Sequence, residues 1–129
     1  MPNPKVFSAS PFEKEFGFCR ALRAGNVIHV AGTAPIGDDG KTHAPNDAAA
    51  QARRCFQIAL KAVETLGGEA ADVVRTRMFL THIEDWPDVG RVHGEFFKDV
   101  QPVSTMVEVS ALIEADWRVE IEVEAVVTG

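Results

Sequence analysis

The segment at positions 119–125 alternates strictly between apolar residues and glutamates, reading Val-Glu-Ile-Glu-Val-Glu-Ala. Successive side chains of a β-strand point to opposite faces, so this pattern predicts a strand with one apolar face and one acidic face. We expect this strand over Trp117–Val127, preceded by another over Ser104–Ser110. A strand of this kind belongs to a sheet whose apolar face is covered by other elements.

Two amphipathic helices can supply that cover. The first follows Asn46 or Asp47, whose side chain can accept a hydrogen bond from a free backbone N–H group, and it stops at Gly67-Gly68. Its apolar positions recur with a helical period at Ala52, Cys55, Phe56, Ala59, Leu60, Val63 and Leu66. The second helix should begin near Asp85, with Pro87 in its first turn. Its apolar stripe consists of Trp86, Val89, Val92, Phe96 and Val100.

The remaining elements are strands and one long loop. We expect an opening strand at Lys5–Ser8, a hairpin of Phe18–Arg23 with Val27–Ala31, and a loop at Thr33–Pro45. A further strand is expected over Asp72–Thr81. Its residues Val74, Thr76, Met78 and Leu80 should point one way, and Arg75, Arg77 and Phe79 the other. The order of elements predicts one α+β domain over residues 1–129, a mixed β-sheet with two helices packed on one face.

The other face of this sheet is expected to be polar. If the valines face the helices, the opposite face carries Arg75, Arg77, Glu108, Glu120 and Glu122. One interpretation is a solvated face with scattered ion pairs, each of which contributes little. The other is a subunit interface, where opposite charges pair and line clefts between protomers.

Composition excludes several classes of function. The chain of 129 residues has a formal net charge of −6, and its basic residues form no run longer than pairs such as Arg53-Arg54. Nucleic-acid binding depends on a basic surface, so no nucleic-acid partner is expected. No apolar run approaches the roughly 20 residues that cross a bilayer. The N-terminus lacks the apolar segment of a signal peptide, and the two cysteines form no Cys-x-x-Cys motif, which predicts a cytoplasmic protein without a membrane partner.

Residues that could carry chemistry are few. His29, His43, His82 and His93 are widely spaced, so no metal site is expected, and no cofactor is implied. Cys55 lies on the apolar stripe of the first helix and is expected in the core, whereas Cys19 is an isolated cysteine on a strand. His93 borders the stripe of the second helix; it is either a partly buried structural histidine or an acid/base that faces a ligand.

Six short blocks, in order, resemble the Rid family, the reactive intermediate deaminases also called YjgF proteins. They are Phe18–Gly25, Val30–Thr33, Gln51, Asp72–Thr76, Glu95–Phe97, and the segment from Pro102-Val103-Ser104 through Leu112 to Val119-Glu120-Ile121. The resemblance implies a chorismate-mutase-like fold and a homotrimer with a small-molecule ligand in each cleft between subunits. It also implies hydrolysis of reactive enamines and imines such as 2-aminoacrylate to 2-oxo acids and ammonia.

Carried over to this chain, the family's site is altered. Glu120 matches the catalytic glutamate, with Glu122 as the alternative if the strand slips by two residues, and Gly32 matches a glycine of the site. The arginine that binds the substrate carboxylate is replaced by Ser104, which offers neither its charge nor its two parallel hydrogen bonds. The residues expected to contact the ligand are therefore Phe18, Gly32, Thr33, Arg77, Gly90, His93, Ser104 and Met106.

A cleft that keeps a glutamate but loses an arginine needs another positive partner, and Arg77, Arg20 or His93 could supply it. The first hypothesis is a Rid-like hydrolase of an imine, an enamine or a related metabolite. Its specificity would be altered and could extend to a substrate without a carboxylate. The second is a non-catalytic small-ligand-binding or chaperone-like trimer. The third is a ribonuclease or translation inhibitor, and the acidic net charge and the lack of a basic or aromatic stripe disfavour it.

Overall fold

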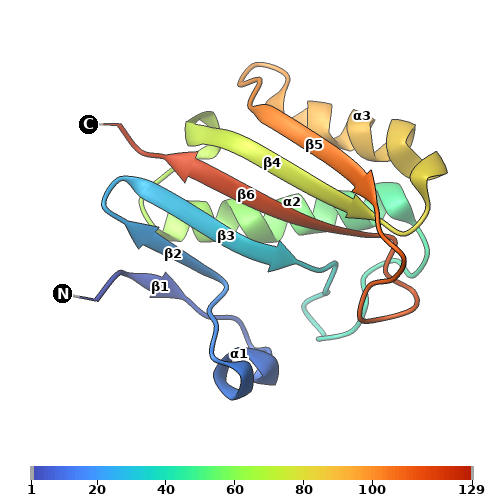
Figure 1. Ribbon diagram of the computed structural model, residues 1–129, viewed down its shortest axis with the longest axis horizontal. Helices are drawn as coiled ribbons and strands as arrows, with labels where there is room; N and C mark the ends of the chain where they lie inside the picture. The colour runs from blue at the N-terminus through green and yellow to red at the C-terminus, as the bar shows by residue number, and fades with distance from the viewer. Residues whose placement is uncertain (1, 129) are drawn as a thin grey trace.

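Strand β6 (Val119–Val126) lies in the middle of a six-stranded sheet with the order β1-β2-β3-β6-β4-β5. It pairs antiparallel with β3 (Val27–Thr33) on one side and with β4 (Val73–Leu80) on the other (Figure 1). The computed structural model describes residues 2–128. The outer strands are β1 (Lys5–Val6), β2 (Ala21–Ala24) and β5 (Val103–Glu108), and β5 runs parallel to β4. The predicted mixed sheet of an α+β fold is confirmed.

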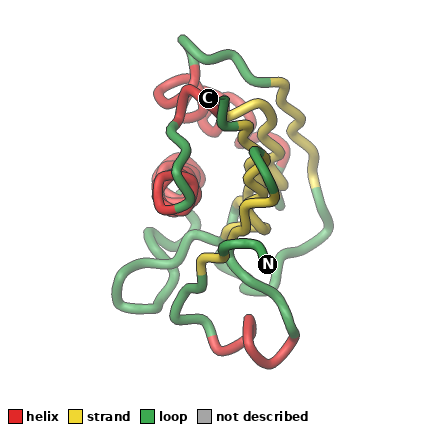
Figure 2. Tube along the Cα trace, turned by 90° about the vertical axis from the view of Figure 1, so that its left-hand side faces the viewer, coloured by secondary structure: helices red, strands yellow, loops and turns green. Residues whose placement is uncertain are grey.

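The apolar face of β6 is the centre of the core. Val119, Ile121, Val123 and Ala125 are all fully buried and belong to one hydrophobic cluster with residues of α2 (Ala48–Thr65) and α3 (Trp86–Phe97). Figure 2 shows a long helix end-on beside the strands, which leaves the other side of the sheet without a helical layer. The two predicted helices therefore pack on one sheet face, as expected from the alternation. Two short 3₁₀ helices, Ala70–Asp72 and Ile83–Asp85, precede β4 and α3.

Helix α2 begins and ends as the sequence predicts. The side chain of Asp47 accepts a hydrogen bond from the backbone N–H of Ala50 (3.1 Å), which satisfies one of the free donors of the first turn. At the other end Gly67 has a φ of 92°, a left-handed conformation that glycine adopts without steric cost. Cys55 is fully buried in the core, as predicted. Within residues 2–128, no helix is both long and apolar enough to span a membrane.

Three orientations differ from the sequence-based expectation. Val74 is 43% exposed because the pairing of β4 with β6 shifts between Val73 and Arg75, which turns Val74 out of the core. Trp86 is 59% exposed at the start of α3, and Phe97 occupies the core at the end of that helix. Glu108 pairs with Leu80 and so lies on the helix side of the sheet, not beside the arginines.

A short helix near the N-terminus was not predicted. Helix α1 (Pro11–Phe16) is capped by Ser10, has a proline at its start and ends at Gly17, whose φ is 79°. One polar network holds this helix against the sheet. Glu13, only 2% exposed, accepts hydrogen bonds from the backbone N–H (2.8 Å) and the hydroxyl of Ser8.

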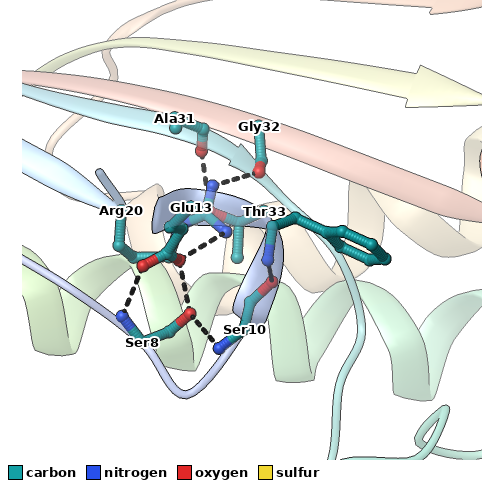
Figure 3. A network of polar contacts seen from close by, with 8 residues as sticks. Ser8, Ser10, Glu13, Arg20, Ala31, Gly32 and Thr33 are labelled. Carbon is teal, nitrogen blue, oxygen red and sulfur yellow. Dashed lines mark hydrogen bonds and ion pairs between the residues drawn. The ribbon is translucent and has the colours of Figure 1, made fainter. Parts of the chain in front are cut away.

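Arg20 connects this network to β3 (Figure 3). Its guanidinium lies 4.0 Å from the Glu13 carboxylate and donates a hydrogen bond to the carbonyl of Gly32. The ion pair is shielded from water, since the side chain of Arg20 is 14% exposed and that of Glu13 is 2% exposed. Buried charges of this kind are stable only when paired, so α1 and β3 depend on each other through Arg20.

We expect Glu13→Ala to lower the free energy of unfolding by about 3 kcal/mol, the lower end of the cost of removing one partner of a buried ion pair. The lower end applies because Arg20 keeps its bond to the Gly32 carbonyl. Urea denaturation measures the change, and Glu15→Ala, at an exposed position of the same helix, is the control. Equal stability of the two variants would show that the Glu13–Arg20 ion pair does not hold α1 against the sheet.

Candidate functional site

Glu120 and Gly32 face each other across neighbouring strands. A Cβ atom built at Gly32 would lie 2.5 Å from Oε2 of Glu120, so any side chain at position 32 would displace this carboxylate. The pairing of β3 with β6 is irregular between Val30 and Thr33, which places Gly32 at a distortion of the strand. Among the described residues, no side chain or backbone N–H donates a hydrogen bond to the Glu120 carboxylate. The two residues predicted to belong to one site are thus adjacent.

Burial raises the pKa of Glu120 above the usual value for a glutamate. The positive charge of Arg20 opposes this effect, and the neighbouring negative charge of Glu122 adds to it. Of the three cations considered for Glu120, Arg20 is therefore the one whose charge acts on it. A carboxyl group whose pKa is raised in this way exchanges protons closer to neutral pH than an exposed glutamate does, which suits general acid–base chemistry.

Arg77 has other partners. Its guanidinium lies 3.1 Å from Glu124 and 3.4 Å from Glu122, across the pairing of β4 with β6. These three side chains line a cavity of about 770 Å³, and Phe18, 42% exposed, lies in its wall. The other lining side chains include Lys5, Phe7, Lys14, Cys19, Leu22 and His29. Glu122 is thus engaged by Arg77, whereas Glu120 is the glutamate beside Gly32.

Ser104 and His93 meet through a residue that was not predicted to belong to the site. The buried hydroxyl of Thr76 lies 2.8 Å from the Oγ of Ser104 and 2.8 Å from Nε2 of His93. Its strand position places Thr76 opposite Ser104 on the parallel strand β5. The ring of His93 packs against Phe56 and Phe97, with ring centroids 5.6 Å and 4.8 Å away. Burial lowers the pKa of His93, so the neutral imidazole is favoured.

The other predicted residues take different places. Met106 packs against the core from the edge strand β5. A Cβ atom at Gly90 would meet nothing within 4 Å, so the surface of α3 is open one turn before His93. Thr33 is buried, and its hydroxyl donates to the carbonyl of Ala31 (2.8 Å) within the same strand. The Thr33 hydroxyl is therefore already satisfied inside the fold.

Within one chain, Ser104 and Glu120 lie on opposite faces of the sheet. Ser104 is paired with Thr76, which faces the helices, whereas Glu120 is paired with Phe79 on the other face. The predicted site residues form separate groups in the single protomer, and the Glu120 group does not include Ser104. Within residues 2–128, no three His, Cys, Asp or Glu side chains gather as a metal site would require.

Comparison with known proteins places this geometry in a family. The model of the family described as Endoribonuclease L-PSP matches residues 9–127. A Mycobacterium tuberculosis protein described as a member of the YjgF/YER057c/UK114 family, Rv2704, has a crystal structure that superposes with a TM-score of 0.88. It is 41% identical, over 98% of this chain and 100% of that one. The chain belongs to the YjgF, or Rid, family.

Two further proteins match this chain by sequence. The Streptomyces coelicolor protein SCO2049 is 39% identical over 121 residues, which cover 94% of this chain and 90% of that protein. The 3-aminoacrylate deaminase RutC of Acinetobacter baylyi is 30% identical over 101 residues, 78% of this chain and 79% of that protein. The resemblance inferred from the six blocks is thus confirmed over nearly the whole chain.

Glu120 makes a testable contribution to stability. A carboxyl group whose pKa is raised by folding stabilises the native state at low pH, and this contribution is lost as the pH rises through the raised pKa. We therefore expect Glu120→Gln to be more stable than the wild type at pH 7, with a difference that shrinks toward pH 4.5, the ordinary glutamate pKa.

Urea denaturation of both proteins at several pH values measures the difference. Glu114→Gln, at an exposed position, is the matched control and should leave the stability nearly unchanged at every pH. A Glu120→Gln variant that is less stable than the wild type at pH 7 would show that the charged carboxylate is stabilised in the fold, contrary to the expectation.

Proposed function

We propose that this protein hydrolyses small imines or enamines in a cleft between the subunits of a homotrimer. The observation that carries the proposal is Glu120, a partly buried carboxyl group with a raised pKa, placed against Gly32 without a hydrogen-bonding partner among the described residues. Groups of this kind cost stability, and they are typical of functional sites. The relative that is a 3-aminoacrylate deaminase supports the same class of chemistry.

The positions of Ser104 and Glu120 support a site that includes a second protomer. Ser104 and Glu120 occupy opposite faces of one sheet, so a ligand can contact both positions only if they come from different chains. Exposed apolar side chains favour such an assembly. On the open sheet face and around α1, the exposed large apolar residues include Phe7, Phe12, Phe16, Phe18, Val103 and Val107. Burial of this apolar surface against another copy would stabilise an oligomer.

Glu120 can manage the protons of the reaction. When water adds to the carbon of a C=N bond, the nitrogen must gain a proton and the water must lose one. A single carboxyl group can donate the first and accept the second as the C–O bond forms. In the second step the carboxyl group again donates a proton to the nitrogen and accepts one from the new hydroxyl group. The C–N bond then breaks, so that ammonia or an amine leaves and a carbonyl product remains.

Ser104 determines which substrates fit. The family's arginine holds a carboxylate, but the Ser104 hydroxyl is neutral and bonded to the equally neutral pair of Thr76 and His93. A carboxylate placed there would lose much of its hydration without gaining a positive partner. The substrate is therefore an imine or enamine with a neutral group at this position.

One alternative is a trimer that binds such molecules without turnover, and the loss of the arginine favours it. A ribonuclease is disfavoured because the formal net charge is −6 and the open face of the sheet carries a row of glutamates. A measurement of turnover distinguishes a hydrolase from a trimer that only binds such molecules.

We expect sedimentation at micromolar concentration to give about three times the chain mass of 14.0 kDa. A charge on the open face should oppose this assembly, so Val107→Lys should shift the distribution toward monomer. Glu64→Lys, at an exposed position of α2 on the other side of the molecule, should leave it unchanged. A wild-type monomer would refute the cleft between subunits.

We expect the protein to accelerate ammonia release from neutral imines, which an amine oxidase generates from primary amines. Glu120→Gln should lower kcat by roughly 10²–10⁴-fold, the usual contribution of general acid–base catalysis, and leave the oligomer intact. Release from 2-aminoacrylate, generated by a serine dehydratase, should be accelerated little or not at all.

Ser104→Arg is the matched test of specificity and should raise activity on 2-aminoacrylate relative to the neutral imine. Equal turnover by wild type and Glu120→Gln would place the chemistry elsewhere. No acceleration with any imine or enamine would favour the binding protein.

A further inference from the structure

A continuous chain of three hydrogen-bonding groups passes through a fully buried hydroxyl to the protein surface. It begins at the ring of His93 on α3, passes through the hydroxyl of Thr76 on β4 and ends at the exposed hydroxyl of Ser104 on β5. Both links measure 2.8 Å. The three residues come from three different elements, and the pairing of Thr76 with Ser104 is fixed by the register of β4 with β5.

The middle group is sealed from solvent. Thr76 is fully buried, and its hydroxyl lies between the other two polar groups. Phe56 and Phe97 pack against the imidazole ring. A proton on Nε2 that leaves by way of Thr76 must therefore pass on to Ser104.

Hydroxyl groups can donate and accept at the same time, so this chain can run in either direction. In one direction His93 donates to Thr76, Thr76 donates to Ser104, and the Ser104 proton points outward. In the other direction Ser104 donates to Thr76, and Thr76 donates to the lone pair of a neutral His93. A concerted reversal carries one proton between the surface and the imidazole without moving any heavy atom.

We propose that Ser104, Thr76 and His93 form a proton relay that lets the half-buried imidazole act as a base on a neutral O–H group bound at Ser104. The proton of that group moves to the Oγ of Ser104, the Ser104 proton to Thr76, and the Thr76 proton to Nε2 of His93. His93 is the proton acceptor, Ser104 is the group that touches the ligand, and Thr76 is a positioning residue between them.

In the reaction this relay would take the proton of the attacking water in place of the Glu120 carboxylate, which then serves only as the proton donor to the nitrogen in this step; this role rests on the proposed function. The water loses its proton to the relay as its oxygen bonds to the imine carbon, and the nitrogen takes a proton from Glu120. When the C–N bond breaks, the nitrogen leaves as ammonia with the proton returned from His93. Glu120 regains its own proton from the hydroxyl that becomes the carbonyl.

The surroundings of His93 suit a base that is neutral at rest. Phe56 and Phe97 are apolar, and the lowered pKa of His93 is caused by burial, with no charged side chain among its causes. The imidazole is therefore uncharged near neutral pH and has a free lone pair. Gly90, one turn earlier on α3, leaves open space beside this region of the helix.

Three variants separate a relay from a merely structural contact. Ser104→Val and Ser104→Thr have the same shape and differ in one hydroxyl, and Ser104 lies at the surface of an edge strand that tolerates β-branched residues. Thr76→Val removes the middle hydroxyl at constant shape. The measurement is the exchange rate with solvent of the Nε2 proton that His93 takes up below its pKa, followed by NMR of the ¹⁵N-labelled protein at acidic pH without any substrate.

We expect exchange to be slowed about tenfold or more in Ser104→Val and in Thr76→Val, as the loss of one hydrogen-bonded step implies, and to stay near the wild-type rate in Ser104→Thr. Equal rates in the two Ser104 variants would overturn the relay, as would exchange too fast to measure in every protein. If Thr76→Val fails to fold, the comparison of Ser104→Val with Ser104→Thr still tests the relay.

The resting-state measurement separates this proposal from the proposed function. Equal exchange rates would remove the relay and leave hydrolysis by Glu120 untouched. The expected pattern of rates without turnover of any imine would leave the relay standing and remove the hydrolase.

Discussion

The strict alternation of β6 is the constraint on which the rest of the structure depends. Its apolar side chains fill the centre of the core, and its glutamates must therefore point to the opposite face. Each glutamate has a different environment there. Glu122 and Glu124 share Arg77, whereas Glu120 faces the bare backbone of Gly32 and stays without a hydrogen-bonding partner among the described residues. One repeated pattern thus gives two paired carboxylates and one unpaired carboxyl group with a raised pKa.

The polar network around Arg20 links the Glu120 carboxylate to the N-terminal part of the chain. Arg20 binds Glu13, donates to the carbonyl of Gly32 and acts on Glu120 through its charge. The residue that holds α1 in place therefore also moderates the pKa of Glu120. A substitution at Arg20 would change stability and acid–base chemistry together, so loss of activity in such a variant would not by itself identify a catalytic role.

Periodicity and capping predicted most of the fold, because both depend on local sequence. They failed where strand pairing determines which way a side chain points. The irregular register after Val73 turns Val74 outward, and Glu108 lies on the helix side because it pairs with Leu80. Helix α1 was missed because it is short, although Ser10-Pro11 and Gly17 carry its start and stop signals. The residues of the site were named by resemblance, but Thr76 was not. Its signal was a hydroxyl at a core-facing strand position, which needs a partner such as His93.

The place of β6 in the chain has a consequence for how the protein is made. This central strand is the last of the described elements, and it separates β1-β2-β3 from β4-β5. While a ribosome is still synthesising the chain, β3 and β4 each present an unpaired edge, and the two halves of the sheet have nothing between them. The sheet can close only after residue 126 has emerged. A chaperone that shields strand edges would therefore act on β3 and β4 until β6 has emerged.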